Sequence, residues 1–218
     1  MNPFLLIFSI ISLFISKQKN AQADSVTAKV DGVTYHAVLN DDESISIKTS
    51  IGKTVLHLRK NELHLDYEAF GKFEFVDFNG DGYKDLYIEY LSNIPDRGDL
   101  ILYDKRSKSF IKVKDFPDYP ESIRIPNTNV YYSYHRSGCA DSDWDSDLYK
   151  ITNYKIVKIG NISGRDCGDD EKQGVFIYKI NGHNERMVET RSIQALNGFK
   201  DTKWGFLAIY WKNNYKKF

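Results

Sequence analysis

The sequence predicts a mostly β protein with an antiparallel, hairpin-rich fold, either propeller-like or sandwich-like, and three features indicate this class. The 218 residues include 15 Tyr and 13 Phe, and aromatic side chains favour pleated, half-buried surfaces. Apolar and polar residues alternate in short segments, as around Leu63, Leu65 and Tyr67, which is the two-residue period of a strand. Turn dipeptides such as Asn181-Gly182 separate these segments. No segment has a long, capped 3.6-residue period, so we expect little helix.

The N-terminal segment has the pattern of a signal peptide. Phe4–Ile15 is apolar except for two serines, and it is shorter than the roughly 20 residues that span a bilayer. Ala21-Gln22-Ala23 follows it and has the A-x-A form of a signal-peptidase site. We interpret residues 1–23 as a cleaved signal peptide, with an uncleaved anchor as the alternative. A secreted or periplasmic protein without stable membrane insertion is therefore expected.

Residues 24–218 are expected to form a single mostly-β domain, built as one body or as two lobes, 24–70 and 71–218. The proline-containing stretch 115–129 is interpreted as an extended connector. Lys and Arg together number 30, and Asp and Glu together also number 30. Because nucleic-acid binding needs a basic surplus to neutralise phosphates, no nucleic-acid partner is expected.

The chain has two cysteines, Cys139 and Cys167. In an oxidising compartment two cysteines pair by default, so we predict a disulfide between them. Closing a loop of this length stabilises a fold by roughly 3–4 kcal/mol in the chain-entropy treatment. A catalytic thiol is the alternative.

The segment Asp77–Asp85, here called the acidic loop, spaces oxygen-bearing residues as a Ca²⁺ site does. Ca²⁺ takes six to eight oxygen ligands, mostly carboxylates and carbonyls. Gly80 and Gly82 permit the positive φ angles that a tight wrap requires. The predicted ligands are Asp77, Asn79, Asp81, the backbone carbonyl of Tyr83, and Asp85. A metal-free hairpin tip made of two turn dipeptides is the alternative.

This loop differs from an EF-hand. Its twelfth position would be Ile88 rather than a bidentate Glu, and its flanks have the pattern of strands rather than helices. We therefore expect a strand–calcium loop–strand unit in which the ion has a structural role.

The acidic loop resembles the D-x-[DN]-x-D-G-x-x-D loop of FG-GAP and VCBS repeats, which occur in integrin-type β-propellers. The resemblance covers roughly residues 70–114, with Asp99–Asp104 and Ser109–Val113 matching the closing hairpin of a blade. It implies a propeller-type strand arrangement, bound Ca²⁺ and an adhesion or scaffold role.

A second segment, Tyr131–Tyr149, combines aromatic, basic and acidic residues. Tyr, Trp and Arg dominate binding hot spots, so this segment is a candidate surface for a protein partner. The candidate contact residues are Tyr134, His135, Arg136, Asp141, Asp143, Trp144 and Asp145.

Three other interpretations of this segment stay open. The tyrosines could pack on one strand face while the run Asp141–Asp147 forms a solvated loop. The alternate aspartates of that run could instead bind a second cation. His135 could act as a catalytic base oriented by an aspartate, which would make the protein a secreted hydrolase.

An export signal, a single calcium loop and the Tyr134-His135 pair together resemble bacterial periplasmic immunity proteins that inhibit lysozyme-like effectors. In that group a Gly-Tyr-His-x-Tyr segment is associated with inhibition, and here Ser133 and Ser137 replace the Gly and the final Tyr. The leading hypothesis is an exported, calcium-stabilised binding protein without enzyme activity, acting as an inhibitor or immunity protein against a lysozyme-like cell-wall hydrolase. An adhesion or scaffold module is the runner-up, and a secreted hydrolase is third.

Overall fold

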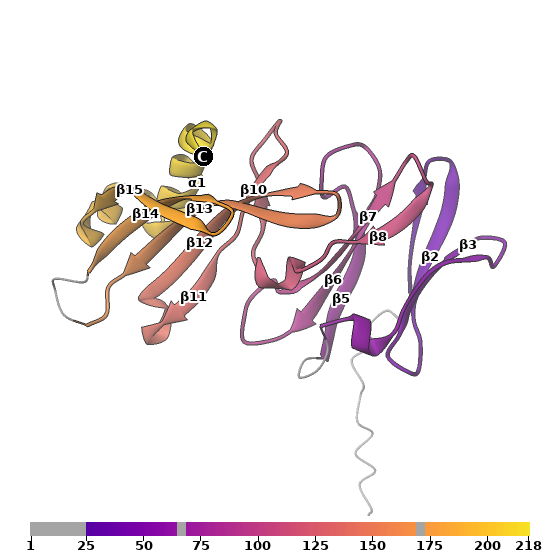
Figure 1. Ribbon diagram of the computed structural model, residues 1–218. Helices are drawn as coiled ribbons and strands as arrows, with labels where there is room; N and C mark the ends of the chain where they lie inside the picture. Colours follow the sequence, from indigo (N-terminus) through magenta and orange to yellow (C-terminus); the bar gives the residue numbers. More distant parts are fainter. Residues whose placement is uncertain (1–24, 65–68, 169–172) are drawn as a thin grey trace, which may run out of the picture.

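The computed structural model describes residues 25–64, 69–168 and 173–218. The expected signal peptide, residues 1–23, lies outside the described residues. Within these ranges the protein is mostly β and its strands pair antiparallel within three sheets, which confirms the fold class (Figure 1).

The first sheet is a four-stranded meander in the order β1-β2-β3-β4. Its strands are β1 (Ser25–Val30), β2 (Val33–Leu39), β3 (Ile45–Thr49) and β4 (Thr54–Leu58). The turn between β1 and β2 has positive φ at both Asp31 and Gly32, as a two-residue hairpin turn requires.

The second sheet is another four-stranded meander, β5-β6-β7-β8. Its strands are β5 (Ala69–Val76), β6 (Asp85–Leu91), β7 (Gly98–Asp104) and β8 (Ser109–Lys112). The acidic loop joins β5 to β6, and β7 and β8 form the hairpin expected after it. The strand–loop–strand unit is therefore confirmed.

The third sheet is larger, in the order β15-β14-β13-β12-β10-β9 with β11 also paired to β12. Its strands are β9 (Ile123–Arg124), β10 (Val130–Tyr132), β11 (His135–Gly138), β12 (Asp143–Thr152), β13 (Lys155–Arg165), β14 (Gly174–Asn181) and β15 (Asn184–Arg191). Most of the acidic run Asp141–Asp147 therefore lies in strand β12, so its interpretation as a solvated loop is wrong.

Helical segments are short except near the C-terminus. The 3-10 turns are η1 (Lys60–Glu62), η2 (Phe116–Asp118), η3 (Cys139–Asp141), η5 (Ile193–Gly198) and η6 (Tyr215–Lys217), and the α-helix is α1 (Lys203–Asn214). In the described part of the chain no helix is long and apolar enough to cross a bilayer. The connector 115–129 contains η2 and β9 rather than only extended chain.

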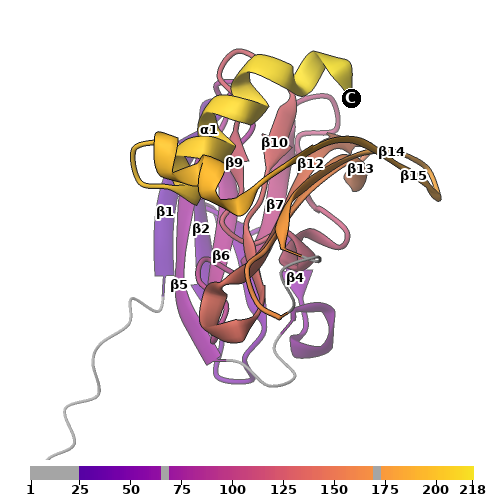
Figure 2. The same ribbon diagram turned by 90° about the vertical axis from the view of Figure 1, so that its left-hand side faces the viewer.

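The three sheets and α1 stack as four layers (Figures 1 and 2). One core lies between the first and second sheets and includes Ile47 and Ile88. A second core joins the second sheet to the third and includes Leu100 and, at its edge, Ile151. A third core lies between the third sheet and α1. The boundary expected at residue 70 falls inside β5, and the sheets on either side of it share the first core.

The sequence pattern did not reveal α1. Apolar residues lie on both sides of the helix, since Leu207 is buried while Trp204 and Ile209 are exposed. Its first turn contains Gly205, where a Cβ atom would lie 1.8 Å from the carbonyl oxygen of Lys200. Packing against the third sheet, rather than local sequence preference, accounts for this helix.

Two aliphatic residues of α1 test this packing. Leu207 is 1% exposed and Ile209 is 49% exposed. We expect Leu207→Ala to lower the free energy of unfolding by about 2–5 kcal/mol. The matched control Ile209→Ala should change it by about 0.5 kcal/mol or less. Urea unfolding followed by circular dichroism measures both, and equal effects would contradict this packing.

Candidate functional site

Asp85 is the last residue of the acidic loop and contacts the start of the loop. Its side chain is fully buried at the start of β6. One carboxylate oxygen accepts a hydrogen bond from the N–H of Phe78 at 3.0 Å and a longer one from Asn79 at 3.5 Å. The other accepts from the N–H of Tyr103 in β7 at 2.9 Å. Burial is the main cause that raises the pKa of Asp85 to about 7, and the Tyr103 N–H opposes this rise. Asp85 therefore joins the two ends of the loop and ties them to β7.

The remaining polar side chains of the loop fold back onto its own backbone. The N–H of Asp81 donates to Asn79 Oδ1 at 3.0 Å, and the N–H of Tyr83 donates to Asp81 Oδ1 at 2.9 Å. Asn79 Nδ2 donates to Asp81 Oδ2 at 3.0 Å. Gly80 and Gly82 have φ angles of 68° and 88°, as the sequence predicted.

Asp77 is the loop residue whose hydrogen bonding is incomplete. Its Oδ2 accepts from the N–H of Gly82 at 3.1 Å, while its Oδ1 is buried and has no hydrogen-bond partner. A buried carboxylate oxygen without a partner costs free energy, and a cation would satisfy it. In the described ranges no group of three or more His, Cys, Asp or Glu side chains gathers as a metal site. The atoms of the loop that could coordinate a metal ion are oxygens, which fit a hard ion such as Ca²⁺.

The second candidate site is an exposed segment, Arg136–Ser142, here called the tip. It comprises the last three residues of β11, the turn η3 and Ser142. Residues 136–140 are exposed. The predicted disulfide between Cys139 and Cys167 is confirmed, with 6.2 Å between the Cα atoms. Cys139, Ala140 and Asp141 have φ angles of 48°, 50° and 77°, a left-handed conformation that is rare outside glycine.

Two aspartates hold the base of the tip. Asp141 accepts a hydrogen bond from the Tyr134 hydroxyl and pairs with Lys203 of α1 at 2.8 Å. Asp143 accepts from the N–H groups of Asp166 and Cys167 at 2.9 and 3.2 Å. The tip is thus tied to α1 on one side and to the end of β13 on the other.

The other two aspartates of the acidic run are buried within the third sheet. Arg165 binds both carboxylate oxygens of Asp145 at 3.0 Å. Asp147 lies 2.6 Å from Lys158 Nζ and accepts a hydrogen bond from Asn161 at 2.8 Å. Burial alone would raise the pKa of each carboxyl group. Ser137, Ser163 and Arg165 together lower the pKa of Asp145, and His135, Lys158 and Asn161 together lower that of Asp147. Basic side chains therefore already compensate the charges of Asp145 and Asp147.

Not all of the predicted partner-binding residues lie on the surface. Trp144 is 1% exposed and Tyr134 is 3% exposed, and both belong to the core under α1. Trp144 packs so closely under Gly164 that a Cβ there would lie 2.0 Å from its ring. Because these two residues and Asp145 are buried, the prediction that they contact a protein partner is corrected. Arg136 remains, with 56% of its side chain exposed.

His135 faces the aspartate that the hydrolase alternative requires. Its Nε2 lies 3.7 Å from Asp147 Oδ2. This interaction with Asp147 is the main cause that raises the pKa of His135, and burial opposes it. The nearby hydroxyls of Ser137 and Ser163 both donate to Asp145 rather than to His135.

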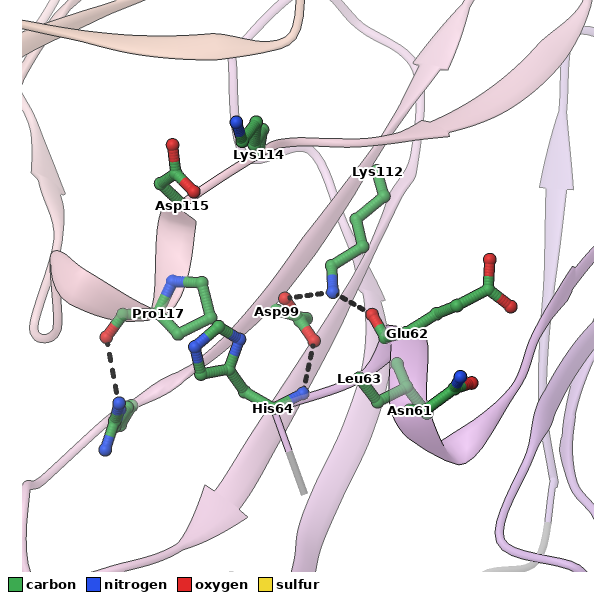
Figure 3. Close-up of a pocket in the computed structure, with 10 residues that line it drawn as sticks. Asn61, Glu62, Leu63, His64, Asp99, Lys112, Lys114, Asp115 and Pro117 are labelled. Atoms are coloured by element: carbon green, nitrogen blue, oxygen red, sulfur yellow. Dashed lines mark hydrogen bonds and ion pairs between the residues drawn. The ribbon is translucent and has the colours of Figure 1, made fainter. Parts of the chain in front are cut away.

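A cavity that the sequence did not indicate lies beside η1 and β8. Its volume is about 560 Å³, and its lining includes His64, Asp99 and Lys112 (Figure 3). Asp99 is fully buried, pairs with Lys112 at 3.0 Å and accepts hydrogen bonds from the Tyr90 hydroxyl at 2.5 Å and the N–H of His64 at 3.3 Å. These contacts anchor the segment that follows η1 to the second sheet.

Each candidate site also has a basic residue beside it that could not be predicted from the sequence. Lys203 at the tip and Arg124 beside the acidic loop lie 40 or more residues along the chain from the groups they approach. No local spacing signals such pairs, because the packing of separate sheets and α1 brings them together.

No protein-family model and no curated protein matches the chain. A solved structure entitled "Structure of a Xanthomonas Type IV Secretion System related protein" aligns with a TM-score of 0.48 at 16% identity, over 78% of this chain and 95% of that one. "Structure of Dos1 propeller" aligns with a TM-score of 0.30 at 13% identity, over 73% of this chain and 57% of that one. Neither likeness identifies a family for the chain.

The ion pair of His135 with Asp147 predicts a pH-dependent contribution to stability. A raised histidine pKa stabilises the fold below the ordinary imidazole value of 6.5, and this stabilisation is lost as pH rises through the folded value. We expect His135→Gln to lower the free energy of unfolding by about 0.5–1 kcal/mol more at pH 5.5 than at pH 8.5. Urea unfolding at both pH values measures this difference.

The matched control is His183→Gln, because His183 is exposed in the turn between β14 and β15. It should cost the same at both pH values. A His135→Gln effect that is equal at both pH values, or larger at pH 8.5, would show that the ion pair does not act in this way.

Proposed function

We propose that this chain is an exported, calcium-stabilised binding protein that inhibits a lysozyme-like cell-wall hydrolase. The observation that carries the proposal is the tip, Arg136–Ser142. It is an exposed segment whose residues Cys139–Asp141 have a left-handed backbone conformation, and it is fixed by a disulfide and by the hydrogen bonds of two aspartates. A loop that is already ordered loses little conformational entropy on binding, so more of its contact energy becomes affinity.

Arg136 is the residue that suits the tip to such a partner. Its guanidinium is 3.9 Å from Asp141, a loose contact, and most of the side chain is exposed. Arginine offers a fork of N–H donors that matches a carboxylate. Glycoside hydrolases carry a pair of catalytic carboxylates in an open cleft. An exposed tip that is held by a disulfide and carries one arginine therefore suits contact with such a cleft.

The resemblance to periplasmic immunity proteins points to the same segment, but the roles of Tyr134 and His135 differ here. Tyr134 is buried beneath the tip and His135 lies at its base. In this proposal the two residues support the tip, and Arg136 makes the contact. Export to the periplasm or the cell exterior fits a partner that acts on the cell wall.

Calcium has a structural role in the proposal. The ion would be held by oxygens of Asp77, Asn79, Asp81, Tyr83 and Asp85. It would satisfy the buried Oδ1 of Asp77 and offset the negative charge that gathers around Asp85. Extracellular modules of this kind bind Ca²⁺ with dissociation constants on the order of 10⁻⁴–10⁻³ M.

Melting temperatures with and without calcium test the metal. We expect 10 mM Ca²⁺ to stabilise the wild type by about 1.4–2.7 kcal/mol relative to EGTA, a rise in Tm of about 3–10 °C. Asp81→Ala should lower the Tm and remove its calcium dependence. Asp104→Ala is the matched control, because Asp104 caps the β7–β8 turn with similar hydrogen bonds; it should keep the calcium response. A wild-type melting curve that ignores EGTA would exclude the metal.

Inhibition assays test the tip. Residues 24–218 are mixed with several lysozyme-type muramidases, and the loss of turbidity of a cell-wall suspension is followed. We expect inhibition by the wild type and a weakening of at least about tenfold with Arg136→Ala, the size of a hot-spot loss. Arg186→Ala, an exposed arginine on β15, is the control and should inhibit like the wild type.

Other outcomes of the same assay separate the alternatives. The absence of both inhibition and a complex would refute the proposal. A complex without inhibition would favour an adhesion or scaffold module, which the two consecutive four-stranded meanders also suit, since propeller blades are four-stranded sheets. Loss of turbidity caused by the protein itself would favour a hydrolase.

A further inference from the structure

Arg124 lies directly against the acidic loop. A Cβ atom built on Gly80 would lie 1.5 Å from Arg124 Nη1 and 2.6 Å from its Cζ. The guanidinium therefore fills the space that any larger residue at position 80 would need. Gly80 permits this close approach, which a larger residue would allow only if the guanidinium moved, and it also has a positive φ of 68°.

The third sheet, rather than the loop, fixes the position of Arg124. The residue ends β9 and pairs with Tyr131 of β10. Its Nε donates to the carbonyl oxygen of Thr128 at 2.7 Å. The ring of Tyr131 stacks on Phe78 of the loop, with 5.5 Å between centroids. A cation carried by one sheet is thus held against a loop that belongs to another.

The charge of Arg124 remains available to the loop. In the described residues no carboxylate lies within 4.0 Å of its guanidinium. Asn79, Asp81 and Arg124 line one cavity of about 310 Å³ at the junction of the two sheets. Because the loop carries three carboxylates, a fixed positive charge beside it stabilises the metal-free form and opposes an incoming divalent ion.

We infer that Arg124 is a built-in cation that sets the calcium affinity of the acidic loop. This inference rests on the proposed function, in which the loop binds Ca²⁺. Arg124 partly replaces the ion when the loop is metal-free and repels it when the ion arrives. Its removal therefore has two effects of opposite sign: calcium binds more tightly, and the metal-free protein is less stable.

The experiment compares the wild type, Arg124→Gln, Arg124→Lys and the control Arg186→Gln, each confirmed as folded by circular dichroism. Calcium is titrated into each protein in a calorimeter at 20 mM and at 500 mM NaCl, and the Tm is measured in EGTA. For Arg124→Gln at low salt we expect a Kd about three- to tenfold lower than that of the wild type and a lower Tm in EGTA. High salt should reduce the difference in Kd. Arg124→Lys keeps the charge and should bind like the wild type, as should Arg186→Gln.

The outcomes distinguish this inference from the proposal on which it rests. A wild type that binds no calcium would refute the calcium-stabilised function and the role of Arg124 together. A wild type that binds calcium while a folded Arg124→Gln binds it equally or more weakly would overturn the role of Arg124 alone. An equal gain in affinity in Arg124→Lys would show that side-chain bulk, rather than charge, governs binding.

Discussion

The buried carboxylate of Asp85 is the contact on which the arrangement of the middle of the molecule depends. It accepts hydrogen bonds from backbone N–H groups at the start of the acidic loop and from Tyr103 in β7. Its loss would leave buried donors without partners, each costing about 1–3 kcal/mol. This carboxylate sets the path of the loop, and the path of the loop places Phe78 and Gly80 against the third sheet.

From Phe78 a series of aromatic contacts runs into the third sheet. Its ring stacks on Tyr131 at 5.5 Å, Tyr131 stacks on Tyr149 at 5.4 Å, and Tyr149 contacts Tyr119 at 4.8 Å between centroids. Such contacts add to the free energy of area burial, about 0.5–1.5 kcal/mol for a pair. The acidic loop therefore holds the second and third sheets together, in addition to joining β5 to β6. The third sheet in turn holds the tip, Arg136–Ser142, together with α1.

The features that local sequence determines could be predicted. The acidic loop, its glycines with positive φ and the β7–β8 hairpin depend on residues close together in the chain. The disulfide could be predicted from two cysteines in a chain that begins with the pattern of a signal peptide. Pairings across strands and layers could not be predicted. The aspartates of β12 looked solvated because Lys158 and Arg165, which compensate them, lie on β13. Trp144 looked like a contact residue, because the sequence does not show that α1 covers its face of the sheet.

Hydrogen exchange measured by mass spectrometry, in calcium and in EGTA, tests most directly whether the acidic loop holds the second and third sheets together. If it does, calcium slows exchange in the acidic loop and, to a similar extent, in residues 123–132 of the third sheet. Strands β2 and β3 belong to the first sheet, and we expect them to exchange equally in both conditions. Slowing in the loop without any change in residues 123–132, or no slowing in the loop at all, would contradict this role.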